Sequence, residues 1–123
     1  MNTLAKMDFC KGMIVEINFP NVGGSIQKGK RPAIIVGNDV GNEHSPILIV
    51  VPLTSSKTKS HLPTHCWITP TKENGLQTVS LVLAEQIFTL PKTAVSKEIG
   101  YVKYSDLKKI NECLKISLDI KNN

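Results

Sequence analysis

The sequence predicts a mainly β fold with α, namely a small barrel of strongly curled antiparallel strands followed by a C-terminal helix. Three observations carry this prediction. The chain has 123 residues, enough for one domain with one core. Short apolar runs are separated by segments rich in glycine, proline and asparagine, which is typical of antiparallel strands joined by tight connections. Only the last part of the chain shows apolar residues at helical spacing.

The first expected strand, residues 12–19, has the clearest pattern. Apolar side chains alternate along it, so that one face is apolar and the other is mixed. The apolar face is made by Met13, Val15, Ile17 and Phe19, and the other face by Ile14, Glu16 and Asn18. Such alternation indicates a half-buried strand near the start of the domain.

Further strands are expected where apolar runs recur. The runs lie at residues 32–36, 47–53, 64–69, 78–83 and 85–90. Residues 20–30 and 55–63 are expected to be polar loops, and residues 37–42, dense in turn formers, are interpreted as a turn. Pro32 stands at the first position of its run, where a strand tolerates proline.

A helix is expected from about Asp106 to Ile120. Ser105 suits the N-cap, and Asp106 suits the first turn because its carboxylate faces the positive end of the helix dipole. Apolar residues then recur at helical spacing, namely Leu107, Ile110, Leu114 and Leu118.

Composition narrows the class of protein. The 15 basic and 10 acidic residues give a net charge of +5, which favours polyanionic partners such as nucleic acid or an acidic protein segment. Cys10, Cys66 and Cys113 are an odd number, far apart and without a CxxC pair, so a reducing cytoplasm is expected rather than a disulfide scaffold or a cysteine zinc site. No apolar run approaches the length of a membrane span.

The domain is expected to occupy residues 11–120. Residues 1–10 carry neither the apolar run of a secretory signal nor the pattern of a transit peptide. They are expected to form a flexible N-terminal extension.

Arg31 is the one arginine among 15 basic residues. It lies in Gly29-Lys30-Arg31-Pro32, after a glycine-containing loop and before a predicted strand. A guanidinium offers a planar fork of donors that lysine cannot copy on a phosphate or carboxylate. A surface ion pair is the alternative, and position alone does not decide between the two.

Other chemistry-bearing patterns are weak. His61 and His65 are four residues apart, but Pro63 between them prevents the helix that would place both on one face, so no metal site is expected. Cys66 follows His65 directly, and neighbours on a strand point to opposite faces, so a Cys–His dyad is not expected. No signature of a nucleotide-binding or serine hydrolase site is present, and no cofactor is expected.

Three groups of polar residues remain as candidates. Thr54 follows Pro52 and Leu53 at the entrance of a polar loop, where a structural turn-capping role is the alternative. Glu85 and Gln86 are adjacent inside an apolar run, so one of them is expected to point inward and to need a hydrogen-bond partner. Asn38, Asp39 and Asn42 are interpreted as turn residues.

Taken in order, these motifs strongly resemble those of the MazF/PemK toxins, the endoribonucleases of type II toxin–antitoxin pairs. The resemblance spans about residues 11–118 and is closest in pattern to MazF of Gram-positive bacteria. The matching segments are the loop Gly24-Ser25-Ile26-Gln27-Lys28-Gly29-Lys30-Arg31-Pro32, the turn Asn38-Asp39, the strand end Pro52-Leu53-Thr54, the segment Leu62-Pro63-Thr64-His65 and the run Ala84-Glu85-Gln86-Ile87. Ile26 departs from the glutamate that is common in the family.

The resemblance implies an SH3-like barrel of the CcdB/PemK type and a metal-independent, sequence-specific endoribonuclease acting on single-stranded RNA. The ribose 2′-OH attacks the adjacent phosphate, leaving a 2′,3′-cyclic phosphate (or a 3′-phosphate) and a 5′-OH end. Arg31 and Thr54 are the implied catalytic residues, because a preorganised donor fork stabilises the charge that gathers on the phosphate oxygens. Arg31 suits an acid or an electrostatic clamp, and His65 is a candidate base whose structural role is the alternative.

Base reading by the loops is also implied by the resemblance. The implied RNA-binding residues are Val22, Ser25, Gln27, Lys28, Lys30, Leu62, Ser80, Glu85 and Gln86, with Lys57 and Lys59 guiding the backbone. The implied partners are mRNA, a second copy of the chain, and a MazE-type antitoxin whose acidic disordered segment covers the RNA path. The alternatives are a non-catalytic CcdB-like gyrase poison and an RNA- or protein-binding barrel.

Overall fold

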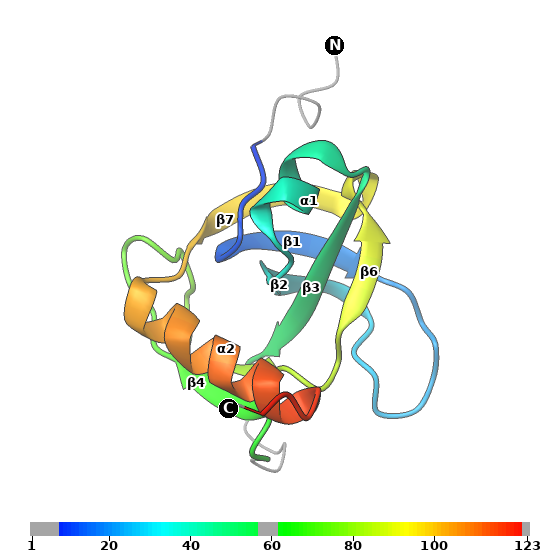
Figure 1. The fold of residues 1–123 in the computed structure, drawn as a ribbon. Coiled ribbons are helices and arrows are strands. Elements are labelled where there is room, and N and C mark those ends of the chain that lie inside the picture. Colours follow the sequence, from blue (N-terminus) through cyan, green and yellow to red (C-terminus); the bar gives the residue numbers. More distant parts are fainter. Residues whose placement is uncertain (1–7, 57–61, 122–123) are drawn as a thin grey trace.

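A computed structural model describes residues 8–56 and 62–121 of the chain. Its strands and helices follow in the order β1 (Met13–Phe19), β2 (Gly29–Ile35), α1 (Asp39–His44), β3 (Ile47–Thr54), β4 (His65–Ile68), β5 (Ser80–Leu83), β6 (Phe88–Pro91), a 3-10 turn (Lys92–Ala94), β7 (Val95–Tyr101) and α2 (Tyr104–Ser117). The strands curl around a common interior, and α2 lies across one end of the barrel (Figure 1). The expected fold class is confirmed.

All strand pairs in the described part of the chain are antiparallel. The strand order is β4-β5-β3-β2-β1-β7, and β6 pairs with β3 outside this path. The long strand β3 organises the sheet, because its middle pairs with β2, its first half with β6 and its end with β5. Hydrogen bonding does not join β4 to β7, so the curled sheet is not closed into a complete barrel.

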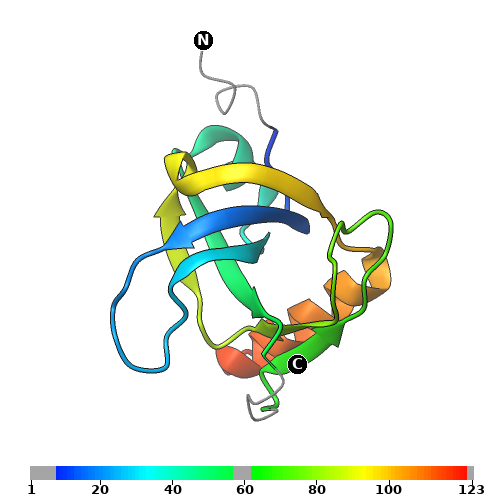
Figure 2. The same cartoon turned by 180° about the vertical axis from the view of Figure 1, so that it is seen from behind.

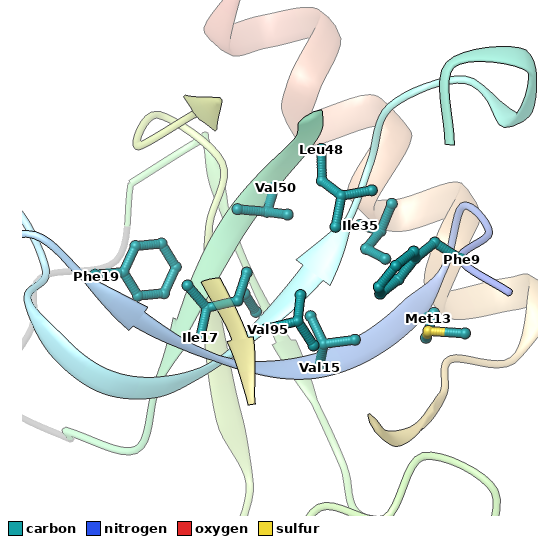
Figure 3. Packing of buried hydrophobic residues seen from close by; sticks show 10 residues of the cluster. Phe9, Met13, Val15, Ile17, Phe19, Ile35, Leu48, Val50 and Val95 are labelled. Atoms are coloured by element: carbon teal, nitrogen blue, oxygen red, sulfur yellow. The ribbon is translucent and has the colours of Figure 1, made fainter. Parts of the chain in front are cut away.

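The alternation predicted for β1 is confirmed. Its apolar face enters the larger core cluster, where Val15 and Ile17 are fully buried beside Ile35, Val50 and neighbouring side chains (Figure 3). Ile14, on the opposite face, is also fully buried, in a second cluster with Ile34, Val51 and Ile110 of α2. The middle of the sheet is therefore buried on both faces, which explains why residues 33–35 of β2 and 50–53 of β3 are apolar without alternation.

Phe9 and Cys10 belong to the folded part of the molecule, although the sequence placed them in the flexible extension. Phe9 is 8% exposed and packs in the larger cluster, and Cys10 packs against it (Figure 3). The ammonium of Lys92 lies 5.5 Å from the Phe9 ring centre. Residues 1–7 lie outside the described residues.

Three expected boundaries are wrong. Residues 39–44 form α1 rather than a turn, because the Asn38 side chain caps it by accepting from the Gly41 amide at 2.8 Å. The strand expected at 85–90 begins only at Phe88, since the Gln86 amide donates to the Leu83 carbonyl and closes a turn. The C-terminal helix starts at Tyr104, its N-cap is Lys103 rather than Ser105, and it ends at Ser117.

Leu118 and Ile120 are therefore not part of the apolar face of α2, and each is 56% exposed. Ile110 is buried as its place in the helical pattern predicts, and Cys113 is buried as well. Strand β7 was not predicted. Its pairing with β1 contains two register shifts, which break the simple alternation that reveals a strand in sequence.

In the described residues, none of the helices combines the length and apolarity needed to cross a membrane.

Candidate functional site

Arg31 lies in β2 and Thr54 at the end of β3, two strands that pair with one another. The pairing joins Ile35 to Val50 and Ala33 to Pro52, so each candidate residue lies two positions beyond the last recorded pair. Side chains two apart on a strand share a face, so Arg31 follows the face of Ala33 and Thr54 that of Pro52. The two predicted catalytic residues therefore lie beyond the same end of the β2–β3 pairing.

The Arg31 side chain is held by its own loop. Its Nε donates to the Lys28 carbonyl at 2.8 Å, which fixes the plane of the guanidinium. No carboxylate within residues 8–56 and 62–121 forms an ion pair with Arg31. The terminal nitrogens remain available for a bidentate contact with an anion, which is the arrangement expected of a phosphate-binding arginine rather than of a surface ion pair.

The Thr54 side chain is buried, at 4% exposure of the residue. Its hydroxyl oxygen accepts from the Ser56 amide at 3.1 Å. An accepting bond of this kind orients the hydroxyl and leaves its hydrogen to be donated elsewhere. The turn-capping role that the sequence suggested is present, and it is compatible with a donor role toward a ligand.

A pocket of about 480 Å³ lies where β2 begins and β3 ends. Arg31 and Thr54 both belong to its lining, together with Lys30 and Ser80 from the set predicted by resemblance. Four of the predicted residues, from β2, β3 and β5, are therefore brought together by the fold. The other residues that line the pocket are Glu16, Pro32, Leu53, Ser55, Gly75, Leu76, Gln77, Thr78, Lys97 and Ile99.

The sequence did not single out Lys97, Glu16 or the 75–78 segment as site residues. Lys97 lies opposite Glu16 across the β1–β7 ladder, with Nζ 4.0 Å from the Glu16 carboxylate, which also accepts from the Ser96 hydroxyl at 2.7 Å. No local motif marks these residues, because they reach the pocket only through pairing of distant strands.

The loop between β1 and β2 projects from the barrel (Figures 1 and 2). Val22 is 58% exposed, and Ser25, Lys28 and Lys30 are exposed as well. Gln27, in contrast, is 8% exposed. The predicted RNA-binding residues of this loop therefore divide into a solvent-facing group and one side chain turned into the protein.

Glu85 and Gln86 lie in the turn between β5 and β6. The Gln86 side chain spans to the β1–β2 loop, where its Oε1 accepts from the Gln27 amide at 2.8 Å and its Nε2 donates to the Ser25 carbonyl at 3.2 Å. The Glu85 carboxylate accepts from the Thr64 hydroxyl at 3.0 Å and bonds the His65 ring at 2.9 Å. One of the two was expected to point inward and to need a hydrogen-bond partner, and in the structure both have partners.

Partial burial alone would raise the pKa of Glu85, but the hydrogen bonds from His65, from the backbone and from Thr64 lower it below its usual value. Glu85 is thus held as a carboxylate. Exposed Leu62 and buried Ser80 complete the predicted set, and the Ser80 hydroxyl donates to the Thr78 carbonyl at 3.1 Å. Lys57, Lys59 and His61 lie outside the described residues.

The His65 side chain is only 2% exposed, and both ring nitrogens are hydrogen-bonded. Nδ1 accepts from the Leu62 amide at 3.2 Å, so Nε2 carries the hydrogen and donates to Glu85. Burial raises the pKa of the neighbouring Cys66 thiol to about 12, which makes it a poor nucleophile. The geometry favours the structural role for His65 over that of a base.

The family of the chain follows from its similarity to known proteins. The family of PemK-like, MazF-like toxins of type II toxin–antitoxin systems matches residues 11–118. The chain belongs to this family. It is 36% identical over 110 residues to the endoribonuclease MazF of Staphylococcus saprophyticus, covering 89% of this chain and 91% of that protein. The expectation of a MazF/PemK-type endoribonuclease toxin, drawn from the sequence, is confirmed.

Solved structures of MazF-like toxins share the fold. A mycobacterial endoribonuclease in complex with its cognate antitoxin has a TM-score of 0.76 and 25% identity, covering 94% of this chain and 99% of that chain. MazF of Deinococcus radiodurans has a TM-score of 0.77 at 21% identity, covering 93% and 99% of the two chains, and at that identity the likeness shows the fold alone.

Proposed function

We propose that this MazF-like toxin is a metal-independent endoribonuclease that cleaves single-stranded RNA at specific sequences, with Arg31 and Thr54 as its catalytic residues. The observation that carries the proposal is the guanidinium of Arg31. It is oriented by the Lys28 carbonyl at 2.8 Å, makes no ion pair with a described carboxylate, and lines the same pocket as Thr54.

The chemistry follows from this arrangement. The ribose 2′-OH attacks the adjacent phosphorus, the P–O5′ bond breaks, and the products are a 2′,3′-cyclic phosphate, which water can open to a 3′-phosphate, and a 5′-OH. Negative charge accumulates on the non-bridging oxygens in the transition state. The terminal nitrogens of Arg31 stabilise that charge through two parallel hydrogen bonds, and the Thr54 hydroxyl supplies a further donor. The guanidinium is protonated before the reaction begins, so Arg31 acts as a clamp or as an acid and not as a base.

RNA binding is proposed to extend from the pocket to the β1–β2 loop, which leads into Lys30 and Arg31, and to Leu62. Val22, Ser25 and Leu62 are exposed and suit contacts with unstacked bases. Lys28 and Lys30 are exposed near Arg31 in the chain and suit the flanking phosphates. Ser80 contributes to the pocket itself. The proposed RNA-binding set also includes Gln27, Glu85 and Gln86.

The proposed partners follow from the charge and from the relatives. The net charge of +5 favours an acidic segment as well as RNA. A mycobacterial relative of the same fold is found in complex with its cognate antitoxin. We therefore expect a MazE-type antitoxin with an acidic disordered segment, a homodimeric toxin, and action on mRNA in the cytoplasm, with arrest of translation and growth as the result.

Cleavage of a long RNA of mixed sequence in EDTA tests the function. Purified wild-type protein, free of antitoxin, is compared with Arg31→Lys, and the new ends are mapped. Discrete cuts with 5′-OH ends, lost in the lysine variant while its circular dichroism stays native, are the expected result. Absence of cleavage by folded wild-type protein overturns the proposal and favours a non-catalytic toxin.

A further inference from the structure

The turn between β5 and β6 contacts two segments that carry predicted RNA-binding residues, namely the β1–β2 loop and residues 62–65. Two consecutive residues of this turn reach in different directions. Gln86 bonds the backbone of the β1–β2 loop at Ser25 and Gln27, and Glu85 bonds Thr64 and His65 at the start of β4. These contacts join segments that are 20 to 61 residues apart in the chain.

The side chain of Gln86 hydrogen-bonds backbone atoms of the β1–β2 loop rather than side chains. A single amide group uses its oxygen as acceptor and its nitrogen as donor toward two positions of one loop. The loop is otherwise exposed, with Gly23 and Gly24 in the left-handed region at φ +93° and +62°. Glycines lower the rigidity of a loop, so side-chain contacts of this kind set its conformation.

The contacts of His65 are buried. The His65 side chain is 2% exposed, accepts from the Leu62 amide through Nδ1 and donates to Glu85 through Nε2. Glu85 receives a second hydrogen bond from Thr64. A charge-assisted bond between a carboxylate and a buried ring is stronger than a bond between neutral groups, so these contacts fix residues 62–65 relative to the turn.

We propose that His65, Glu85 and Gln86 are positioning residues that form one brace across the β5–β6 turn, holding the β1–β2 loop and the 62–65 segment in the arrangement that receives RNA. In the free protein, the side chains of these three residues hydrogen-bond other parts of the chain. The inference rests on the proposed ribonuclease function for its effect on RNA, but the brace itself is a property of the free protein.

The brace has two reporter amides. The Gln27 amide donates to Gln86, and the Leu62 amide donates to His65. Hydrogen exchange of these two amides, measured by NMR on the free full-length protein, therefore reports the contacts of Gln86 and those of His65 separately. Gln86→Leu is expected to accelerate exchange at Gln27 and to leave Leu62 unchanged. Gln86→Glu keeps an acceptor for the Gln27 amide and is expected to preserve most of its protection.

The contacts of His65 are tested by two substitutions, because asparagine and glutamine each mimic one nitrogen of the histidine ring. His65→Asn keeps a group near Nδ1 and is expected to retain protection at Leu62, whereas His65→Gln keeps a donor near Nε2 and is expected to retain the contact with Glu85. Glu85→Gln replaces the carboxylate that receives the Nε2 hydrogen. It is expected to affect Leu62 through His65 and to leave Gln27 unchanged.

RNA cleavage kinetics give the functional readout. Loss of one such hydrogen bond is expected to raise KM up to about tenfold with little change in kcat, because the loops bind substrate and transition state alike. The matched controls are Glu43→Gln and His44→Gln, which alter an exposed pair with a 3.6 Å separation on α1. These controls are expected to leave both amides and both kinetic constants unchanged.

Unchanged exchange at Gln27 and unchanged KM in a folded Gln86→Leu variant overturn the brace, as does an equal effect in the control variants. If wild-type protein does not cleave RNA, the proposed function fails, and the exchange of the two amides still decides whether the brace exists.

Discussion

The proposed RNA-binding site has two parts, or borders, that are held in different ways. On one side, Arg31 and Thr54 are placed by the β2–β3 ladder, whose middle is fully buried. On the other side, the β1–β2 loop and the 62–65 segment are held by a few side-chain hydrogen bonds from His65, Glu85 and Gln86. The first border is fixed by backbone pairing, and the second depends on individual side chains.

This difference separates the tasks of the site. Groups that stabilise a transition state need fixed geometry, which strands in a packed sheet provide. Loops that bind single-stranded bases can change in sequence and conformation without disturbing the packing of the core. Substitutions on the strand border are therefore expected to act on kcat, and substitutions on the loop border on binding.

The largest effect is expected at Arg31. Arg31→Lys keeps the charge but removes the donor fork and the bond from Nε to the Lys28 carbonyl. A loss of kcat on the order of a thousandfold is expected. Single-turnover cleavage under saturating RNA measures it. A lysine variant as fast as wild type, with native circular dichroism, contradicts the role of the fork.

Thr54→Val is expected to have the next largest effect. The substitution keeps the shape of the side chain and removes its single donor, so kcat is expected to fall about a hundredfold, less than for the fork of Arg31. The Ser56 amide also loses its acceptor. Thr54→Ser, which restores the hydroxyl, is the matched control, and its failure to recover activity argues against a donor role.

Smaller effects are expected from the exposed lysines beside the pocket. Lys28→Gln and Lys30→Gln each remove one charge near the proposed path of the RNA. Each is expected to reduce the slope of log binding constant against log salt concentration by about 0.7 for single-stranded RNA. Fluorescence titration of a non-cleavable RNA at several salt concentrations measures the slope. Lys121→Gln, on the exposed C-terminal segment, is the control.

The Glu85 carboxylate gives a pH-dependent contribution to folding. Its pKa is lowered in the folded protein by bonds from His65 and Thr64, so its stabilisation is present above its usual value of 4.5 and is lost as the pH falls through the folded pKa. Thermal unfolding between neutral pH and pH 3 is expected to show a steeper loss for wild type than for Glu85→Gln. Parallel curves contradict the lowered pKa.

The smallest effect is expected from the exposed pair Glu43 and His44. Their side chains are 76% and 71% exposed, whereas those of Glu85 and His65 are 32% and 2% exposed. Because exposed pairs contribute little, removing either charge is expected to leave unfolding and RNA cleavage unchanged. A clear effect on cleavage places α1 in the site and removes the contrast between the two pairs.

Much of the sheet was predictable because its strands carry a strong local signal. The apolar alternation of β1 and the continuous apolar runs of β2 and β3 gave their positions to within a few residues. Strand β7 lacked this signal, since register shifts interrupt its pairing with β1. The start of the helix was predicted too late, because Lys103 caps it without a side-chain hydrogen bond. Its end was predicted beyond Ser117, where the helix stops.

The sequence by itself determined the chemistry that is available. One arginine beside a glycine-containing loop, a threonine at a strand end and the ordered motifs around them pointed to the MazF/PemK family. Only the tertiary structure decided how these groups meet, because the pairing of β2 with β3 brings Arg31 and Thr54 to one pocket and the β5–β6 turn brings Gln86 to a loop about 60 residues earlier in the chain. Side chains so distant in sequence carry no local signal of their contact, since that contact arises only when the sheet has paired and curled.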